Sequence, residues 1–446
     1  MKKGMPNVYI ILNFKNRIEQ ENIRELSDCI RKKGIRRSVF SDYENTENLF
    51  QYDVKLPQYK VSDQGQTGRC WIYAAFNMIR PSLIQKHRLK DILFSQNYIA
   101  FYDLLEKANY FLEMIFETLD EDIDGRFLSM KLQHPIQDAG QWFYFQNIVE
   151  KYGLVTQEAM PDNMHSQNTS ELISVLSDLL RENACEIRSE YKQCRDLEGF
   201  RMKKESMLYE IYRILAMSLG EPPERFDADL ELMDGTFVKE KQVTPREFYE
   251  KYISENYNED YCMIVNIPLE TKPYHKNYKV SYLGNVWNAK TYPYLNLPMQ
   301  ELKQLVKKQV EAGIPVWFGC DSRVYTDRDN GIFSLELFDL KTIGYQTNML
   351  KKEENLQYGL SNLTHAMVIK GFSCDQQGNI DKWLVENSYG EKMGHQGYFT
   401  MSDEWFDVFV YEAVIHKKFL DDTRLSDCEK ESIMLPTWDI LGTLAN

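Results

Sequence analysis

One cysteine in this chain stands where a thiol could become a nucleophile. Cys70 follows the turn-forming segment 64–69, which contains two glycines, and it begins a helical run that continues to Arg80. The first backbone N–H groups of a helix lack partners within it, and the helix dipole is positive at that end. Both effects favour the thiolate, which is the nucleophilic form of cysteine. The pattern indicates acyl-transfer chemistry at Cys70, provided that a base lies elsewhere in the chain.

A glutamine precedes this cysteine by six residues. The side-chain amide of Gln64 can donate a hydrogen bond toward the carbonyl oxygen under attack. Donors aimed at that oxygen stabilise the charge that develops on it. We therefore expect Gln64 to form an oxyanion hole with the backbone N–H of Cys70.

The base is sought among seven histidines, and one of them lies in a predicted β-hairpin. His365 begins a β-rich run, a turn is predicted at 373–379, and a second strand follows at 382–388. A hairpin centred near residue 376 places Asn387 opposite His365, because both are equally far from that centre. The Asn387 amide oxygen would accept from one imidazole nitrogen and direct the other toward a nucleophile. A slip of one residue would place the two on opposite faces.

Each of these three residues also has an ordinary structural interpretation. A single histidine in a strand is usually a core or surface residue, and an asparagine after a strand is usually a turn former. A single cysteine usually behaves as a small buried hydrophobe. The conjunction of all three with Gln64 favours a catalytic Cys70–His365–Asn387 set.

Bulk properties exclude several other classes of function. The 446 residues carry a net charge of −14, so counterion release on nucleic acid would not favour binding. None of the eight cysteines forms a CxxC pair, and the closest two have no histidine nearby at the spacing of a zinc site. We therefore expect neither a metal nor another cofactor. No apolar run reaches membrane-spanning length. We expect a cytoplasmic protein with reduced thiols and no nucleic-acid or membrane partner.

Composition changes along the chain divide it into five predicted regions. They are an N-terminal arm at 1–60, a helical lobe with the cysteine at 61–164, a charge-rich helical insertion at 165–258, a β-rich lobe with the base at 259–430, and a C-terminal arm at 431–446. Helices in the first half and strands in the second predict an α+β protein.

The segments around Cys70, His365 and Asn387 resemble the papain-type cysteine peptidase signatures. Arg69, in place of the usual Ser or Ala before the cysteine, and the 295 residues between Cys70 and His365 are similar to one branch, the bleomycin hydrolase and aminopeptidase C family. Further segments that resemble this family lie at 105–113, 149–153, 244–249, 294–298, 316–321 and 402–406.

This resemblance implies a papain-like fold of two lobes, a helical lobe carrying the cysteine and a β-barrel-like lobe carrying the histidine and asparagine. It also implies a helical hook insertion, a C-terminal arm in the substrate cleft, and a homohexamer whose active sites face an inner chamber. The implied activity is that of a cysteine aminopeptidase acting on peptides with a free N-terminus and needing no cofactor.

The resemblance also assigns substrate contacts. It implies that the segment containing Asp138 and Gly140 pairs with the substrate backbone, and that a terminal carboxylate on the arm, here Asn446, holds the substrate amino group. Five positions depart from the family pattern, namely Ala139 for Gly, Tyr389 for Trp, Leu441 and Thr443 within the tail, and Asn446 beyond the usual closing alanine. These departures leave two alternatives open: a catalytically weakened peptide-binding chamber, and an enzyme with altered exo or endo selectivity.

Overall fold

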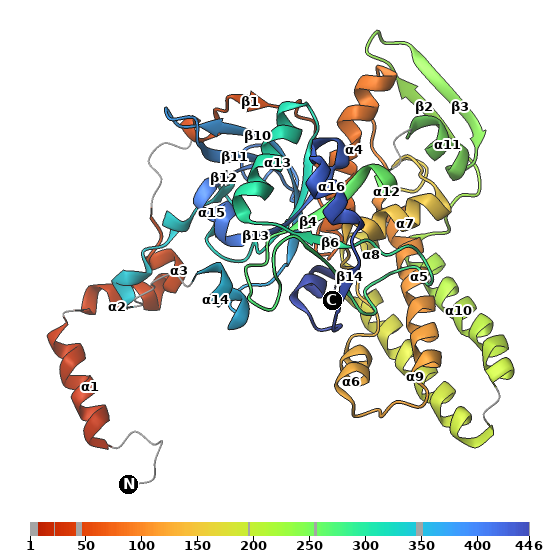
Figure 1. The fold of residues 1–446 in the computed structure, drawn as a ribbon, viewed down its shortest axis with the longest axis horizontal. Helices are drawn as coiled ribbons and strands as arrows, with labels where there is room; N and C mark the ends of the chain where they lie inside the picture. The colour runs from red at the N-terminus through yellow and green to blue at the C-terminus, as the bar shows by residue number, and fades with distance from the viewer. Residues whose placement is uncertain are drawn as a thin grey trace.

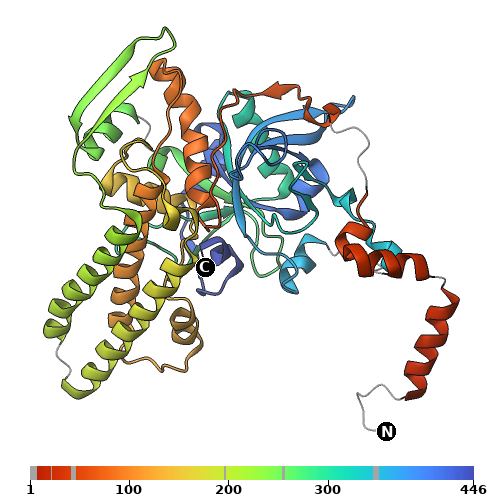
Figure 2. The same ribbon diagram turned by 180° about the vertical axis from the view of Figure 1, so that it is seen from behind.

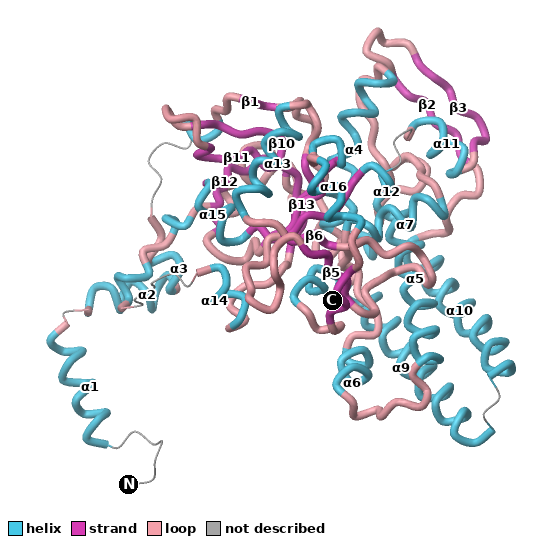
Figure 3. The backbone as a smooth tube through the Cα atoms, in the orientation of Figure 1, coloured by secondary structure: helices cyan, strands magenta, loops and turns pink. Residues whose placement is uncertain are grey.

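The computed structural model describes residues 8–21, 23–41, 47–194, 197–253, 257–344 and 351–445. Helices gather on one side of the body and strands on the other, as Figures 1 and 3 show. The N-terminal helices α1 (Val8–Gln20), α2 (Arg24–Lys33) and α3 (Ile35–Ser38) extend away from this body (Figures 1 and 2). The predicted α+β class is confirmed.

Three helices form the centre of the helical side. They are α4 (Cys70–His87), α5 (Gln96–Glu117) and α7 (Trp142–Tyr152). Helix α5 begins after Ser95, whose hydroxyl accepts a hydrogen bond from the Tyr98 N–H at 3.0 Å and caps the helix. Helix α7 is followed by Gly153, which has a φ of 80°, and a Cβ there would lie 2.2 Å from the Pro245 carbonyl oxygen.

The insertion is helical at first and then changes character. Its long helices α9 (Ser170–Cys194) and α10 (Leu197–Leu219) pack beside α5 and project from the body (Figures 1 and 2). A hairpin of β2 (Phe226–Glu231) and β3 (Phe237–Val243) follows, where only helix was expected. The outward face of that hairpin is highly charged. Its sequence is therefore similar in charge to the helices before it, although its residues alternate between buried and exposed.

Twelve strands among the described residues form one sheet, and nine of them are central to this description. They are β1 (Val54–Lys55), β4 (Tyr261–Val265), β5 (Lys276–Val280), β6 (Tyr294–Asn296), β7 (Val316–Cys320), β10 (His365–Cys374), β11 (Ile380–Glu386), β12 (Tyr398–Ser402) and β13 (Val410–His416). The remaining three are β8 (Thr326–Asp327), β9 (Ile332–Phe333) and β14 (Ser432–Leu435). The order is β14-β5-β6-β4-β13-β7-β10-β11-β12-β9-β8, with β1 beside β10.

The remaining helices surround these two parts. Those that follow the first lobe in sequence are α6 (Arg126–Gln133), α8 (Met164–Gln167), α11 (Pro245–Tyr252) and α12 (Tyr257–Asp260). Those in the strand-rich half are α13 (Met299–Glu311), α14 (Lys352–Gln357), α15 (Asp403–Phe409) and α16 (Asp422–Glu429). The short helix η5 (Ile440–Ala445) ends the described chain.

Two strands of the sheet pack directly against the cysteine helix. Residue contacts join α4 to β10 and to β7, and the Trp317 indole N–H donates to the Trp71 carbonyl oxygen at 3.3 Å. Both tryptophans are fully buried. This packing brings the start of α4 to the start of β10, where the predicted nucleophile and base lie.

Candidate active site

The turn before Cys70 is held by a carboxylate from a distant segment. Gly68 donates its backbone N–H to Asp138 Oδ2 at 2.7 Å, and a Cβ at position 68 would lie 2.4 Å from the other Asp138 oxygen. Thr169 donates its hydroxyl to Asp138 Oδ2 at 2.5 Å. Only glycine fits this approach, and it delivers the chain to the first residue of α4, which is Cys70 as predicted.

The Cys70 thiol lies against the beginning of β10. The backbone N–H of Ala366 donates to Cys70 Sγ at 3.4 Å, and the thiol is only 4% exposed. Ala366 is the residue after His365. The structure therefore brings the predicted nucleophile to the segment that carries the predicted base.

The predicted partnership of His365 and Asn387 is present as a direct hydrogen bond. His365 Nε2 lies 2.9 Å from Asn387 Oδ1. An amide oxygen can only accept, so Nε2 carries the proton and donates it, and Nδ1 is left to exchange a proton with a nucleophile. Asn387 Oδ1 also accepts from the Ser388 backbone N–H at 2.8 Å, which fixes the amide.

The hairpin register behind this contact differs from the predicted one by two residues. Val368 pairs with Glu386 and Ile369 with Val385, so Asn387 lies diagonally across from His365 instead of directly opposite. Irregularities between Ile369 and Gly371 and between Ser373 and Cys374 accompany the shift. Because side chains alternate with a period of two, a shift of two residues keeps both side chains on one face.

Tyr389 covers this hydrogen bond, at a position where the family pattern has a tryptophan. Its ring stacks on the His365 imidazole with centroids 5.1 Å apart and planes 17° apart. The Arg328 guanidinium lies 5.3 Å from the centre of the Tyr389 ring on which it packs. The tyrosine ring, although smaller than that of tryptophan, thus shields the hydrogen bond between His365 and Asn387.

Burial decides the resting protonation of both reacting groups. It raises the pKa of Cys70 to about 12, although N–H groups of Ala366, Trp71 and Cys70 itself act to lower that pKa. It lowers the pKa of His365 to about 4, while the bond to Asn387 opposes the shift and the Arg328 charge adds to it. Neither group ionises readily alone. A proton passed from thiol to imidazole creates two opposite charges that stabilise each other, so the pair ionises together.

Gln64 is fixed beside the nucleophile by both ends of its amide. Its Nε2 donates to the Thr67 carbonyl oxygen at 2.7 Å, and its Oε1 accepts from the Ser388 hydroxyl at 2.5 Å. One N–H of the amide is therefore used within the turn, and the second is available to a ligand. Ser388 follows Asn387, so a single short segment orients both the histidine partner and the predicted oxyanion donor.

Ala139 and Gly140 form a wall beside Trp71 that is anchored by a buried lysine. A Cβ on Gly140 would lie 2.6 Å from Trp71 Cε2, so glycine is required for this segment to lie on the indole. The Lys107 ammonium donates to the carbonyl oxygens of Gln137 at 3.0 Å and Ala139 at 2.7 Å. It also pairs with Asp103 at 2.5 Å. The contacts of Asp138 and Gly140 are thus with the turn and with Trp71, and their role toward substrate stays a prediction.

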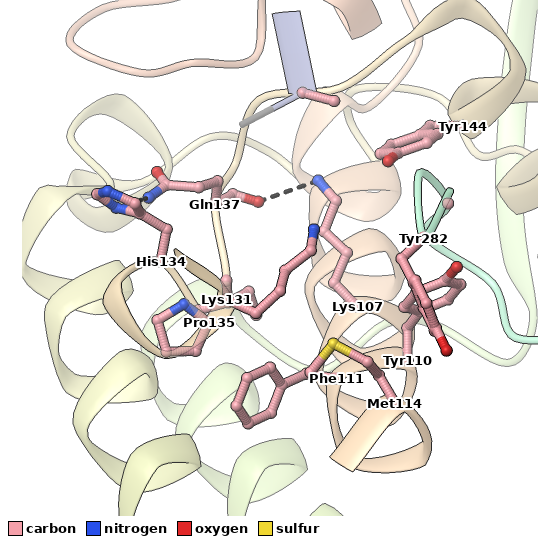
Figure 4. Close-up of a pocket in the computed structure, with 13 residues that line it drawn as sticks. Lys107, Tyr110, Phe111, Met114, Lys131, His134, Pro135, Gln137, Tyr144 and Tyr282 are labelled. Carbon is pink, nitrogen blue, oxygen red and sulfur yellow. Dashed lines mark hydrogen bonds between the residues drawn. The ribbon is translucent and has the colours of Figure 1, made fainter. Parts of the chain in front are cut away.

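The sequence reasoning did not single out Lys107, although the i, i+4 spacing of Asp103 and Lys107 on one helix was a visible signal. Figure 4 shows Lys107 reaching Gln137 at the edge of a small cavity of about 50 Å³. A second lysine, Lys131, also lines this cavity, and burial lowers its pKa to about 8. Ala445, the last described residue, also lines this cavity.

The C-terminal arm approaches this wall. Gln141 donates its side-chain N–H to the Leu441 carbonyl oxygen at 3.3 Å, and Thr443 donates its hydroxyl to the Leu363 carbonyl oxygen at 3.2 Å. An ion pair between Lys272 and Asp439 at 2.8 Å fixes the start of the arm. Asn446, which was predicted to hold the substrate amino group, lies outside the described residues.

Metal-binding clusters and membrane-spanning helices are both absent from the described residues. Within the parts of the chain that the structure describes, no group of three or more His, Cys, Asp or Glu side chains is arranged to hold a metal ion. None of the described helices is both long enough and apolar enough to cross a membrane.

Comparison with known proteins places this geometry in a family. The sequence model of the Peptidase C1-like family matches residues 9–442. Aminopeptidase C of Listeria monocytogenes is 41% identical over 419 residues, which cover 93% of each chain. Bleomycin hydrolase of Gallus gallus is 35% identical, covering 95% of this chain and 94% of its own. The crystal structure of PepW from Lactobacillus rhamnosis HN001 superimposes with a TM-score of 0.94 at 35% identity, covering 98% of both chains.

A cysteine at a helix start, facing a histidine oriented by an asparagine, on a two-lobed α+β fold, defines a cysteine peptidase of the papain-like class. The chain belongs to the Peptidase C1-like family, whose model spans nearly all of it. The predicted resemblance to the bleomycin hydrolase and aminopeptidase C branch is confirmed.

Proposed function

We propose that the protein is a cysteine aminopeptidase that removes N-terminal residues from peptides through a thiolate acyl-enzyme. The observation that carries the chemistry is the contact of the Cys70 thiol with the start of β10, next to a histidine held by Asn387. The similarity to Aminopeptidase C of Listeria monocytogenes over most of both chains supports the choice of an aminopeptidase.

The first half of the reaction builds the acyl-enzyme. His365 takes the thiol proton on Nδ1, and the Cys70 thiolate attacks the scissile carbonyl carbon. The free N–H of Gln64 and the backbone N–H of Cys70 receive the developing oxyanion. His365 then gives its proton to the leaving amine, and Asn387 keeps the ring oriented throughout.

The second half regenerates the free thiol. Water replaces the leaving peptide, and His365 Nδ1 takes a proton from it as it attacks the thioester carbonyl. The tetrahedral intermediate collapses with release of the amino acid and return of the proton to Cys70. The stacked Tyr389 ring excludes bulk water from the Nε2 side of the imidazole during both halves.

Selection of free N-termini is assigned to the arm and the adjoining wall. In this proposal the segment with Asp138 and Gly140 pairs with the substrate backbone, while the arm closes the cleft beyond one residue. The hydrogen bond from Gln141 to Leu441 supports this placement, because it ties the arm to the wall itself. A carboxylate at Asn446 would pair with the α-ammonium of the substrate.

Aminoacyl fluorogenic substrates test the proposal. Wild type should cleave the free amino substrate, and Cys70→Ala should reduce turnover to background, whereas Cys374→Ala should retain it as a matched thiol removal. Unchanged turnover in Cys70→Ala would show that another group does the chemistry. Equal rates on free and N-acetylated substrates would refute recognition of the substrate amino group. Repeating the comparison with protein that lacks Asn446 would show whether that residue provides the recognition.

We further propose a cytoplasmic homohexamer. Helix α1, which projects from the body in Figures 1 and 2, exposes the large apolar side chains of Ile11, Phe14 and Ile18, each between 45% and 53%. Exposed apolar helix faces of this kind are commonly covered by a partner. Light scattering after size-exclusion chromatography should report six copies. A monomer at micromolar concentration would refute the hexamer.

A further inference from the structure

Away from Cys70, two cysteines meet where the C-terminal segment leaves the sheet. Cys262 in β4 and Cys428 in α16 line the same cavity, and their side chains interact with each other. The Cys262 thiol also donates to the Ile415 carbonyl oxygen at 3.4 Å. Both are free thiols and both are partly exposed. Neither takes part in the peptidase mechanism, so this contact calls for a separate explanation.

The two thiols line one surface cavity of about 190 Å³. Two lysines, Lys290 and Lys417, and one glutamate, Glu429, contribute the charged groups of its lining. Much of the remaining lining is apolar, with Met263, Leu295 and Leu425 among its members. Both thiols therefore border a space that a small uncharged oxidant can enter from solvent.

The two sulfurs differ in acidity. The interaction with Cys262 lowers the pKa of Cys428, and the Lys417 ammonium favours the lower value, while burial and the carboxylates of Asp427 and Glu429 oppose it. The same interaction, together with burial, raises the pKa of Cys262 well above that of an ordinary thiol. Cys428 is therefore the thiol that loses its proton first, and Cys262 is poised as the second partner.

We propose that Cys262 and Cys428 form a reversible dithiol site that a hydroperoxide oxidises to a disulfide. The Cys428 thiolate attacks the terminal oxygen of the hydroperoxide, the O–O bond breaks, and an alcohol leaves after protonation. Cys262 loses its proton and attacks the resulting sulfenic sulfur, and the displaced hydroxide takes up that proton as water. Two thiols and one hydroperoxide thus give one disulfide, one alcohol and one water, with two electrons passing to the O–O bond.

The position of this site gives the disulfide a structural consequence. Helix α16 is followed by β14, which pairs with β5, and then by η5. A bond from Cys428 to Cys262 would tie α16 to β4 and add a covalent link at the root of the C-terminal arm. Cross-links that close long loops reduce the freedom of the unfolded chain, so the oxidised protein should unfold at a higher temperature than the reduced one.

Peptide mapping of the full chain tests the proposal directly. Cys70→Ala protein is treated with rising equivalents of hydrogen peroxide, the remaining thiols are blocked with N-ethylmaleimide, and the protein is digested without reduction. We expect one linked pair of peptides, containing Cys262 and Cys428 and lighter by two hydrogen atoms. It should form before Cys374, a partly exposed thiol without a cysteine partner, is oxidised, and dithiothreitol should reverse it.

Serine variants separate the two roles. In Cys262→Ser the sulfenic acid on Cys428 should be trapped by dimedone, about tenfold faster than any adduct on Cys374. In Cys428→Ser no adduct should form on Cys262 at the same peroxide level. Peroxide should raise the unfolding midpoint of the Cys70→Ala protein and leave that of a Cys70→Ala protein carrying Cys262→Ser unchanged. The proposal is overturned if peroxide oxidises the exposed Cys185 and Cys194 while Cys262 and Cys428 stay unlinked.

Discussion

The imidazole of His365 lies face to face with the ring of Tyr389, at a centroid distance of 5.1 Å and an interplanar angle of 17°. This stack seals one side of the hydrogen bond from His365 Nε2 to Asn387 Oδ1. Water that reached this bond would compete for the Nε2 proton and let the imidazole turn. In the proposed mechanism the ring therefore acts on the reaction through the orientation of His365.

Removing the Tyr389 ring should change the titration of His365. In Tyr389→Ala, water reaches the imidazole, the burial that lowers its pKa to about 4 is relieved, and the pKa should rise toward the ordinary value of 6.5. Proton NMR titration in a Cys70→Ala background measures this shift. Tyr389→Phe keeps the stacked ring and should leave the titration near wild type. A pKa that stays low in Tyr389→Ala would show that other groups bury the imidazole.

Loss of Asn387 should reduce turnover with little effect on substrate binding. Asn387→Ala removes the acceptor that holds the Nε2 proton in place, so part of the population presents the wrong nitrogen to Cys70. We expect kcat to fall roughly 10²-fold or more while KM changes little. Steady-state kinetics on an aminoacyl substrate measure both constants. A change confined to KM would contradict an orienting role.

The oxyanion function of Gln64 can be separated from its fixation by Ser388. Gln64→Ala removes the donor and should lower kcat by about 10²–10³-fold. Ser388→Ala removes only the hydrogen bond to Gln64 Oε1, so the amide remains but is less well held, and the loss should be smaller. Near-equal losses in the two variants would mean that Ser388 itself contacts the reacting atoms.

Glycine at position 140 should be essential for placing Trp71, the neighbour of the nucleophile. Gly140→Ala puts a methyl group 2.6 Å from Trp71 Cε2. The indole cannot move aside freely, because its N–H donates to the Asp138 carbonyl oxygen. Overpacking of this kind costs about 1–3 kcal/mol. Urea unfolding should show that loss. A free energy of unfolding equal to that of wild type would show that the indole can move aside without cost.

The proposed catalytic residues were predictable because each one combines an identifiable residue type with an element that the sequence marks. Cys70 follows a glycine turn and begins a helix, and His365 and Asn387 bracket a turn between two β-rich runs. The exact register of that hairpin was not predictable, since it depends on a turn centred near residue 377, where Cys374 pairs with Ile380, and local preferences do not specify that centre to one residue. The predicted pairing was nevertheless on the correct face, because the error was an even number of residues.

What the sequence did not reveal are contacts made only by tertiary packing. Lys107 looks like one of many helix lysines, and only the fold shows that it binds the carbonyl oxygens of Gln137 and Ala139. Glu412 reads as a polar residue within an apolar strand, where a solvent-facing side chain would be the simple expectation. In the fold it is fully buried between β4 and β7. Both positions depend on neighbours far away in sequence.

The buried carboxyl of Glu412 should make the protein less stable as the pH rises. Neither oxygen has a hydrogen-bond partner among the described residues, and Gly319 opposite it leaves room where a Cβ would lie 2.4 Å from Oε1. Burial raises its pKa well above the unfolded value of 4.5, so the folded state keeps a proton that the unfolded state releases. Stability therefore falls as pH rises from that unfolded value toward the folded pKa, by up to about 1.4 kcal/mol per pH unit.

Glu412→Gln cannot titrate and retains the shape, so it should exceed wild type in stability at about pH 8 and approach it near about pH 4. Urea unfolding of both proteins across this range measures the difference, and a wild type that gains stability over Glu412→Gln with rising pH would contradict a neutral buried carboxyl.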